Sequence, residues 1–513
     1  MAENCKVVLH MFERFGFVPN MSPPCMKLET YLRMAKIPYE CDCRLKASSK
    51  GKFPWIEYNG KEIADSNFCI EFLNKEFGVD VDDHLSEEQK GIARSVLVML
   101  EENTYWTLVH YRWCTDYSYE MRDIILAKAP FPIRAAMHWG FQRKVKGYLN
   151  GHGIGRHSFE EIYGIAEKDL KAVSAILGEK NFLFGDKPCL ADAALFALVS
   201  NLIWQMPQCP QGKLILSELK NLEDHSKRMK EAFYPDWDEV SKKKEKNSKY
   251  INNIPSITYN RGKMADKHGV LILHVFPRFG SVVNVSAPCM KLETYLRMAK
   301  IPYECDHSFK TSSKGKLPWI EYNGQEIADS NFCIEFLNRE FGVDVDDHLS
   351  DEQKGIARAV LVMLEENTYW TLVHYRWCSE HANEIRDLAF ANLPLPIRIP
   401  VFWSYKRTLK SELYGHGIGR HTPEEIYGIA EKDLKAVSSI LGEKRFLFGD
   451  KPCLADAALF SLVSNFIFTA PNSTQGKLIL TQLKNLDDHT EQMKELFYPD
   501  WDDVVVGKNS KNK

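Results

Sequence analysis

The sequence predicts a tandem duplicate in which each unit combines a small mixed α/β domain with an all-helical domain. The first observation is a repeat with a constant offset of 264 residues, which relates Cys25 to Cys289 and Trp237 to Trp501. The second is a change near His84, where short strand-like runs give way to long helical patterns. Because each repeat is large enough to bury its own core, we expect two folded units rather than a solenoid.

The first domain of each unit is predicted to be a small mixed sheet with helices. Three short apolar runs are typical of strands: Lys6–Phe12, Tyr39–Leu45 and Trp55–Gly60. A helical pattern follows Cys25, another covers Ser66–Phe77, and the Asn59-Gly60 pair indicates a hairpin. This βαβ…ββα order predicts an α/β domain of about 80 residues.

The second domain of each unit is predicted to be helical throughout. Ser86–Cys114 begins with a capping signature at Ser86, and His157–Leu177 begins with the capping box Ser158-x-x-Glu161. The longest apolar stretch, Ala193–Trp204, is shorter than the roughly 20 residues that a membrane span needs, so we expect a buried core helix. The predicted boundaries are 1–84 and 85–240 for the first unit, 241–268 for a polar linker, 269–348 and 349–506 for the second unit, and 507–513 for a disordered tail.

Bulk composition excludes several classes of function. The formal net charge of -3 gives no reason to expect nucleic acid as a partner, and no transmembrane segment is expected. The start "MAENCKVVLHMF" has no basic segment and long apolar core of a secretory signal. Thirteen cysteines, an odd number, indicate reduced thiols rather than a disulfide framework. We therefore expect a cytoplasmic protein.

Several phrases that recur in both units resemble the failed axon connections family of the glutathione transferase-like superfamily, which also has cadmium-responsive and metaxin-like relatives. They are SPPCMKLETYLRMAKIPYE, GKFPWIEYNG, EENTYWTL, GHGIGR, EEIYGIAEKDL and FYPDW. The superfamily's thioredoxin-like domain is marked by S-x-x-C at a helix start, by GK[FL]PWI entering a strand and by ADSNFCIEFL after a hairpin. The resemblance implies a thioredoxin-like domain followed by a transferase-like helical domain, here present twice, whereas most members carry one unit.

Ser22 and its counterpart Ser286 are the candidate catalytic residues that the resemblance implies, with glutathione as cosubstrate. A thiolate gains about 0.3–1 kcal/mol from a helix N-terminus and about 1.5–3 kcal/mol from a donated hydrogen bond. Together these could lower a thiol pKa by about one to three units. Cys25 and Cys289 are candidate accessory thiols, and a dithiol cycle is not expected because serine holds the first place. The alternative is that Ser22 only caps a helix and Cys25 only packs.

Two further pairs of positions complete the candidate glutathione site by resemblance. Pro54 and Pro318 would follow cis peptide bonds that expose the backbone groups of Phe53 and Leu317 to the tripeptide, although an ordinary X–Pro bond is cis only about 5% of the time. The alternative is a proline that begins an edge strand.

The Asp-Ser pairs before a helix would receive the γ-glutamyl end of glutathione. Ser66 and Ser330 would present a hydroxyl and a helix N-terminus to the carboxylate, with Asp65 and Asp329 near the ammonium group. Taken alone, such a pair is a helix cap.

Other patterns are given less weight. Cys41-x-Cys43, which corresponds to Cys305-x-His307, offers too few ligands for a tetrahedral metal site, so no metal is expected. The glycine-rich 151–157 is not a dinucleotide loop because no strand precedes it. The aromatic residues of Asn103–Trp113 are expected in the core or an interface, with the wall of an apolar second-substrate site left open.

The sequence thus favours a glutathione transferase-like protein that binds glutathione and conjugates or transfers it to an unknown apolar electrophile in detoxification or stress response. The alternative is a noncatalytic adaptor with a transferase fold, acting in axon development or metal stress. Whether the chain is an enzyme stays open, with the transferase preferred. The two units are expected to pair within the chain or to form a homodimer, and a metaxin-like role at mitochondria ranks last.

Overall fold

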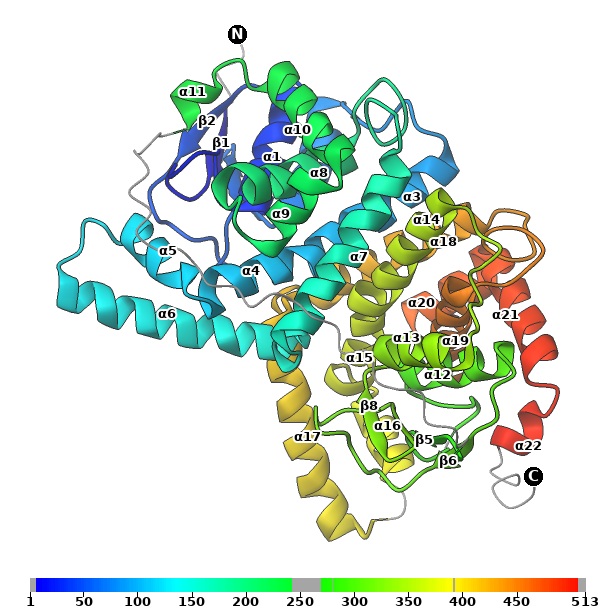
Figure 1. Ribbon diagram of the computed structural model, residues 1–513. Helices are drawn as coiled ribbons and strands as arrows, with labels where there is room; N and C mark the ends of the chain where they lie inside the picture. Colours follow the sequence, from blue (N-terminus) through cyan, green and yellow to red (C-terminus); the bar gives the residue numbers. More distant parts are fainter. Residues whose placement is uncertain (1–5, 242–268, 279, 391–392, 506–513) are drawn as a thin grey trace. The chain divides into compact units, whose positions relative to one another are not determined.

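The computed structural model describes residues 6–241, 269–278, 280–390 and 393–505, and the chain divides into two compact units, Met1–Pro255 and Ser256–Lys513. The predicted linker, apart from Ser241, and the predicted tail lie outside the described residues. Each unit is an α/β domain followed by a helical domain, as predicted (Figure 1).

The first unit begins with a four-stranded mixed sheet. Strand β1 (Val7–His10) pairs in parallel with β2 (Tyr39–Asp42) and antiparallel with β3 (Trp55–Tyr58), and β3 pairs antiparallel with β4 (Lys61–Ala64). The strand order is therefore β2-β1-β3-β4. The second unit repeats it as β6-β5-β7-β8, with bounds of Ile272–His274 for β5, Glu304–Asp306 for β6, Trp319–Tyr322 for β7 and Gln325–Ala328 for β8.

Helix α1 (Pro23–Met34) is shared between the two domains of the first unit. One face packs on the sheet, where Leu28 and Leu32 join the buried cluster around Val7 and Leu9. Its other side packs against α8 (Leu190–Ser200), the apolar helix predicted from the sequence (Figure 1). A residue at the start of α1 therefore lies next to both domains.

The remaining helices of the first unit follow α1 in chain order. They are α2 (Ser66–Phe77), α3 (Glu87–Met99), the π-helical η1 (Leu100–Thr104), α4 (Tyr105–Cys114), α5 (Tyr117–Ile125), α6 (Phe131–His152), the 3-10 turn η2 (Ile154–Arg156), α7 (Phe159–Leu177), the π-helical η3 (Asn201–Gln205), α9 (Pro210–Ser217), α10 (Lys220–Phe233) and α11 (Trp237–Val240). The expected single helix from Ser86 to Cys114 is interrupted by η1, and the expected capping boxes at Ser86 and Ser158 are both present.

The second unit has the same order of helices with one difference. They are α12 (Ala287–Met298), α13 (Ser330–Phe341), α14 (Asp351–Met363), the π-helical η4 (Leu364–Thr368), α15 (Tyr369–Cys378), α16 (Ala382–Ala389), α17 (Leu395–His416), the 3-10 turn η5 (Ile418–Arg420), α18 (Pro423–Leu441), α19 (Leu454–Thr469), α20 (Thr474–Gln482), α21 (Lys484–Phe497) and α22 (Trp501–Val505). Helix α19 continues as α-helix through the residues that correspond to the π-helical η3 of the first unit.

Within the part of the chain that the structure describes, no single helix is long and apolar enough to cross a membrane. Two sharply bent pairs reach that threshold by length and composition, namely Leu190–Gln205 with Pro210–Ser217 and Leu454–Thr469 with Thr474–Gln482.

Candidate functional site

Ser22 lies at the end of the loop that joins β1 to α1, and the loop is fixed from both domains. The Asn20 side chain donates to the Phe12 carbonyl oxygen at 2.9 Å, and its Oδ1 accepts the Ser22 N–H at 2.9 Å. From the helical domain, Gln205 Oε1 accepts the Phe17 N–H at 2.9 Å. A Cβ at Gly16, whose φ is +80°, would lie 2.2 Å from that oxygen, so this close approach requires glycine. The position of Ser22 is therefore set before any ligand binds.

Arg112 of α4, in the helical domain, also holds the loop that carries Ser22. Its guanidinium donates to the Met21 carbonyl oxygen and, at 2.7 Å, to Asn201 Oδ1, and its side chain is buried. Burial lowers the pKa of Arg112. The second unit repeats the arrangement, since Arg376 donates to Val285 and Asn465. Sequence reasoning assigned the surrounding aromatic residues to the core and missed the arginine.

The Ser22 hydroxyl is half-buried at the start of α1, as predicted. Among the described residues it makes no capping hydrogen bond to that helix, and it lies against the Cys25 thiol. Its counterpart Ser286 is buried, with 8% of its surface exposed. The hydroxyl is thus held at a helix N-terminus without acting as its cap.

Cys25 and Cys289 do not have the properties of accessory nucleophiles. Both side chains are fully buried, and burial raises the pKa of each thiol to about 12, although hydrogen bonds from Ser22 and Ser286 oppose the rise. A thiol with that pKa is almost entirely protonated at neutral pH. The expectation of an accessory thiol is therefore corrected, because the fourth position of the motif faces the core of the sheet and not the helix mouth.

The peptide bonds Phe53–Pro54 and Leu317–Pro318 are cis, as expected. Pro54 is buried directly before β3, and the Phe53 ring lies 4.6 Å from the Phe12 ring. The backbone N–H of Phe12 in turn donates to Cys25. The cis-proline segment and the loop that carries Ser22 are therefore neighbours.

Asp65 and Asp329 cap the second helix of each α/β domain from an unusual backbone conformation. Asp65 has φ 84° and ψ 133°, and its carboxylate accepts the Asn67 N–H at 2.9 Å; Asp329 has φ 82° and makes the same bond to Asn331. Ser66 begins α2 and is buried. Non-glycine residues outside the common regions cost about 1–3 kcal/mol and cluster at functional sites. The strain marks this turn as a candidate for function.

A buried lysine joins the starts of α1 and α2. The Lys27 Nζ lies 2.7 Å from Asn67 Oδ1 and 2.5 Å from Glu101 Oε1, and Asn67 donates to Glu101 at 2.9 Å. Lys27 is 1% exposed, and Glu101 belongs to the π-helical η1, a kind of turn that is frequent at functional sites. Because the Lys27 contacts run from α1 to the residue after Ser66, the start of α2 lies beside α1.

These contacts bring the three predicted parts of the site onto adjoining segments. Ser22, the Phe53–Pro54 bond and the Asp65-Ser66 turn are linked through Phe12 and Lys27. In the second unit the lysine link is repeated between Lys291 and Asn331, whereas the Phe276 ring contacts Phe309. Their roles as ligands of glutathione stay predictions. The residues that the sequence analysis missed are the supporting charged side chains Lys27 and Glu101, whose pairing is visible only in the folded unit.

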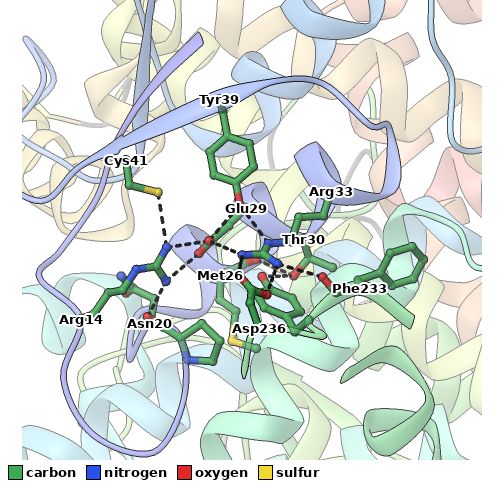
Figure 2. Close-up of polar contacts among 12 residues, drawn as sticks. Arg14, Asn20, Met26, Glu29, Thr30, Arg33, Tyr39, Cys41, Phe233 and Asp236 are labelled. Atoms are coloured by element: carbon green, nitrogen blue, oxygen red, sulfur yellow. Dashed lines mark hydrogen bonds and ion pairs between the residues drawn. The ribbon is translucent and has the colours of Figure 1, made fainter. Parts of the chain in front are cut away.

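A second buried charge network lies behind this site. Figure 2 shows the Glu29 carboxylate of α1, which is fully buried, between the guanidinium groups of Arg14 and Arg33. Glu29 Oε1 is 2.7 Å from Arg14 Nη2 and accepts the Tyr39 hydroxyl at 3.0 Å. Arg33 extends the network to Asp236, at 2.6 Å. A carboxylate this deep is stable only with such partners.

The network fastens the α/β domain to the last helices of its unit. Arg33 also donates to the Phe233 carbonyl oxygen at 3.0 Å and stacks over the Tyr234 ring. Its contacts therefore fall on the FYPDW motif, one of the motifs by which the chain resembles the family. Arg14 donates to the Pro19 carbonyl oxygen at 3.0 Å, which ties the loop carrying Ser22 to the same charges. Arg278, Glu293, Arg297 and Asp500 repeat these contacts in the second unit.

A small cavity and the Cys41 thiol, both among the described residues, are poor alternatives to this site. A cavity of about 20 Å³ beside Pro23, Pro24 and Tyr105 has room for about one water molecule. Cys41, considered as half of a metal pair, lies 3.4 Å from Arg14 Nη2, and a guanidinium repels a cation at that place.

Comparisons with known proteins agree with this architecture. A protein-family model described as the glutathione S-transferase N-terminal domain matches residues 23–118 and 287–383, and one described as the glutathione S-transferase C-terminal domain matches 166–229 and 430–493. The matches to the first model begin directly after Ser22 and Ser286.

Three relatives illustrate the range of similar proteins. Failed axon connections of Drosophila melanogaster is 34% identical over 259 residues, which are 47% of this chain and 61% of that protein, less than two thirds of its length. Isoprene-epoxide–glutathione S-transferase of a Rhodococcus species is 30% identical over 42% of this chain and 94% of its own length. The metaxin-2 homolog of Caenorhabditis elegans is 28% identical over 35% of this chain and 80% of its own length. The chain therefore belongs to the glutathione S-transferase family and carries the family's pair of domains twice.

Proposed function

We propose that each unit binds reduced glutathione at the start of its first helix, with the hydroxyl of Ser22 or Ser286 donating a hydrogen bond to the glutathione sulfur. The observation that carries the proposal is the hydroxyl itself. It is held at a helix N-terminus by Asn20 and Arg112, yet within the described residues it makes no capping bond to that helix. A donor and a helix N-terminus both favour a thiolate over a thiol.

The neighbouring turn fits the other end of the tripeptide. Ser66 begins α2, so the free N–H groups of that helix favour a carboxylate, and the Asp65 carboxylate favours an ammonium group. A γ-glutamyl group carries both charges on one carbon atom. The strained backbone at Asp65 and Asp329 supports the same role, because strain is retained where the surrounding structure requires it.

The proposed reaction is transfer of the glutathione sulfur to an apolar electrophile in the cytoplasm, in detoxification or stress response. The Rhodococcus relative supports this class, since it is named for transfer to isoprene epoxide. The thiol proton would pass to solvent, and the sulfur would form a bond to an electrophilic carbon as the bond from that carbon to its leaving group breaks. A halide would depart with the bonding electrons, whereas the oxygen of an opened epoxide would stay attached and take a proton from water. Ser22 would stabilise the attacking thiolate and donates no proton to the product in this scheme.

A noncatalytic adaptor role is the second candidate. The similarity to Failed axon connections over nearly half of this chain favours it, and the burial of Ser286 favours it for the second unit. In that case glutathione would bind as a structural ligand, or not at all, and the helical domains would carry the function in axon development or metal stress.

The test compares the intact protein with Ser22→Ala/Ser286→Ala. Calorimetry with reduced glutathione measures binding, and conjugation of a generic aryl halide and of an aliphatic epoxide measures turnover. We expect the variant to lose about 10- to 100-fold in turnover, which corresponds to a hydrogen bond of about 1.5–3 kcal/mol to a charged sulfur. The matched control is Ser217→Ala/Thr481→Ala, which removes two exposed hydroxyls at the ends of α9 and α20.

Each result decides between the two candidates. Turnover that falls in the serine variant and not in the control supports the transferase. Binding of glutathione without turnover supports the adaptor. The absence of any binding heat with the intact protein would show that glutathione is neither a cosubstrate nor a structural ligand.

A further inference from the structure

Two long helices, α6 and α17, expose an apolar surface that the proposed glutathione site does not use. In α6 the side chains of Phe131, Ile133, Met137, Trp139 and Phe141 are exposed, and in α17 those of Leu395, Ile397, Ile399, Val401, Trp403 and Tyr405 are. All of them lie in the amino-terminal halves of these helices, Phe131–Phe141 and Leu395–Tyr405. Figure 1 shows the amino-terminal end of α6 extending past α5 and away from the rest of its unit.

The contact that α6 makes with its own unit is a narrow stripe. Val145 and Leu149 are buried toward α4, the buried His138 ring lies 5.5 Å from the Tyr119 ring of α5, and the Gln142 amide donates to the Trp113 carbonyl oxygen at 3.0 Å. At about 100° per residue, these four lie on one side of the helix. Phe402, Leu409 and Leu413 form the same stripe on α17.

The exposed apolar side chains point in several directions around the helix. At about 100° per residue, Phe131 and Trp139 are separated by roughly 80° around the helix axis, Ile133 and Trp139 by roughly 120°, and Phe131 and Ile133 by roughly 160°. The three side chains therefore lie on three different sides of the helix. A flat protein partner would cover one such side. A helix that is apolar nearly all round is suited to immersion in an apolar medium.

The charges on these helices are almost all positive. Helix α6 has four basic residues, Arg134, Arg143, Lys144 and Lys146, and its sequence contains no aspartate or glutamate. Helix α17 has Arg398, Lys406, Arg407 and Lys410, and its one acidic residue, Glu412, pairs with Lys316 at 3.0 Å. Most of the basic residues follow the apolar half directly. This order places cations beside an apolar segment, which complements anionic headgroups above acyl chains.

The two helices have kept this chemistry while their residues diverged. Between 131–149 and 395–413, seven of 19 aligned positions are identical, whereas 17 of 19 are identical between α7 and α18. The tryptophan, one exposed isoleucine, two arginines and one lysine are among the identical positions, and the other exposed apolar residues of α6 are replaced by Leu395, Val401 and Tyr405. A lipid bilayer requires apolar and basic side chains but no particular side-chain shape. Binding to a bilayer would therefore explain why the residue types are kept while the residues themselves differ.

We infer that the amino-terminal halves of α6 and α17 bind the interfacial region of an anionic lipid bilayer, with the apolar side chains among the upper acyl chains and the following basic residues at the headgroups. Tryptophan and other aromatic residues are enriched at that depth. A second copy of this chain is a poorer occupant, because it would present the same basic helices. The inference is independent of whether glutathione binds.

The experiment is sedimentation of the full chain with phosphatidylcholine vesicles, with and without phosphatidylserine, over a range of salt concentrations. We expect binding that requires phosphatidylserine and weakens as salt rises. The quadruple variant Phe131→Ser/Trp139→Ser/Leu395→Ser/Trp403→Ser should bind about tenfold or more weakly. A charge variant, Arg143→Glu/Lys146→Glu/Arg407→Glu/Lys410→Glu, should lose the dependence on phosphatidylserine. The matched control is Leu45→Ser/Leu496→Ser, which removes two exposed leucines elsewhere.

All of the substituted side chains are exposed, so the thermal unfolding temperature should be unchanged. If the wild type binds glutathione, the same affinity in the variants gives a second check of their fold. Lack of sedimentation with anionic vesicles overturns the inference. Equal binding of the control and quadruple variants overturns the assignment to these helices. A change of oligomeric state in the quadruple variant, measured by light scattering without vesicle binding, shows instead that copies of the chain cover this surface.

Discussion

At the scale of the residue, Asp65 combines a helix cap with a backbone that aspartate adopts at a cost. The prediction concerns Asp65→Gly/Asp329→Gly. Glycine adopts a φ of 84° without a Cβ penalty, and its loss of capping costs only a few tenths of a kcal/mol. We expect the free energy of unfolding to be unchanged or raised by about 1 kcal/mol per unit, while affinity for glutathione falls because the ammonium group loses its carboxylate. Chemical denaturation and calorimetry measure the two quantities.

A control for this prediction exists in the same domains. Asn59 and Asn323 have φ values of 49° in hairpins that join strands, away from the helix starts. Asn59→Gly/Asn323→Gly should change stability without changing affinity. If the aspartate variant keeps full affinity, then the turn serves the fold alone.

The residues that carry the candidate site differ in how far sequence could predict them. Ser22, Pro54 and Asp65 were found because each belongs to a local motif whose backbone geometry recurs in the superfamily. Lys27 and Arg112 were missed because their partners Glu101 and Asn201 lie on elements distant in the chain. Glu29 was missed because its burial, and its pairing with Arg14, appear only once the loop before α1 is folded. The thiol role of Cys25 failed for a related reason, because burial depends on which side of α1 meets the sheet.

At the scale of the element, the strands and capped helices lie where their patterns predict them, whereas the sequence predicted a helical domain around α6 without marking that helix itself. Pro130 precedes α6, and the helix itself contains Pro132, several glycines and polar residues within its buried stripe, so hydrophobic periodicity gives little signal of a helix. The glycine-rich residues 151–157, which the sequence marks as no dinucleotide loop, end α6 and form the turn η2 before α7. A proline at the second helical position is compatible with a helix start, which explains why the prolines do not prevent it.

The ion pair between α1 and the segment before α11 gives a prediction about acid. The Arg33 guanidinium lowers the pKa of Asp236 below its usual value, so the carboxylate is more strongly ionised in the folded state than in the unfolded state. A lowered folded pKa stabilises the protein above the unfolded value of about 3.9, and this stability is lost as pH falls below it.

We therefore expect the free energy of unfolding to decrease below about pH 4 in the wild type. Asp236→Asn/Asp500→Asn should be less stable at neutral pH and should show a shallower decrease in acid. Glu239→Gln/Asp503→Asn, at exposed positions in the same segments, is the control. Denaturant titrations at a series of pH values measure the slopes, and identical slopes for wild type and the aspartate variant would show that this pair is unimportant.

At the scale of the whole molecule, the duplication predicts two sites with separate contributions. The second unit repeats the serine at the helix start, the cis X–Pro bond, the aspartate cap and the buried lysine of the candidate site. Calorimetry of the intact chain should therefore give two glutathione molecules per chain, and Ser22→Ala or Ser286→Ala alone should each leave the turnover of one unit. A single variant that abolishes all turnover would show that one unit has no activity of its own.

The two units are nevertheless not identical around the site. Gln205, at the end of the π-helical η3, holds the loop of the first unit, and Thr469 stands at the corresponding place in the second. Thr469 accepts a hydrogen bond from Arg376 at 2.6 Å instead of reaching a loop N–H. We expect the second site to have the weaker affinity, which a two-site fit of the same titration resolves.

The charges that Arg33 and Glu29 share with the end of their unit bear on how such a chain could arise. A copied segment that ended before the FYPDW motif would have left the Arg33 guanidinium without the Asp236 carboxylate and without the Tyr234 ring that packs on it. Natural selection would discard such a fragment as a misfolded product. A duplication that leaves both copies able to fold therefore has to include the complete pair of domains, and the constant offset of 264 residues, which relates Cys25 to Cys289 and Trp237 to Trp501, agrees with this.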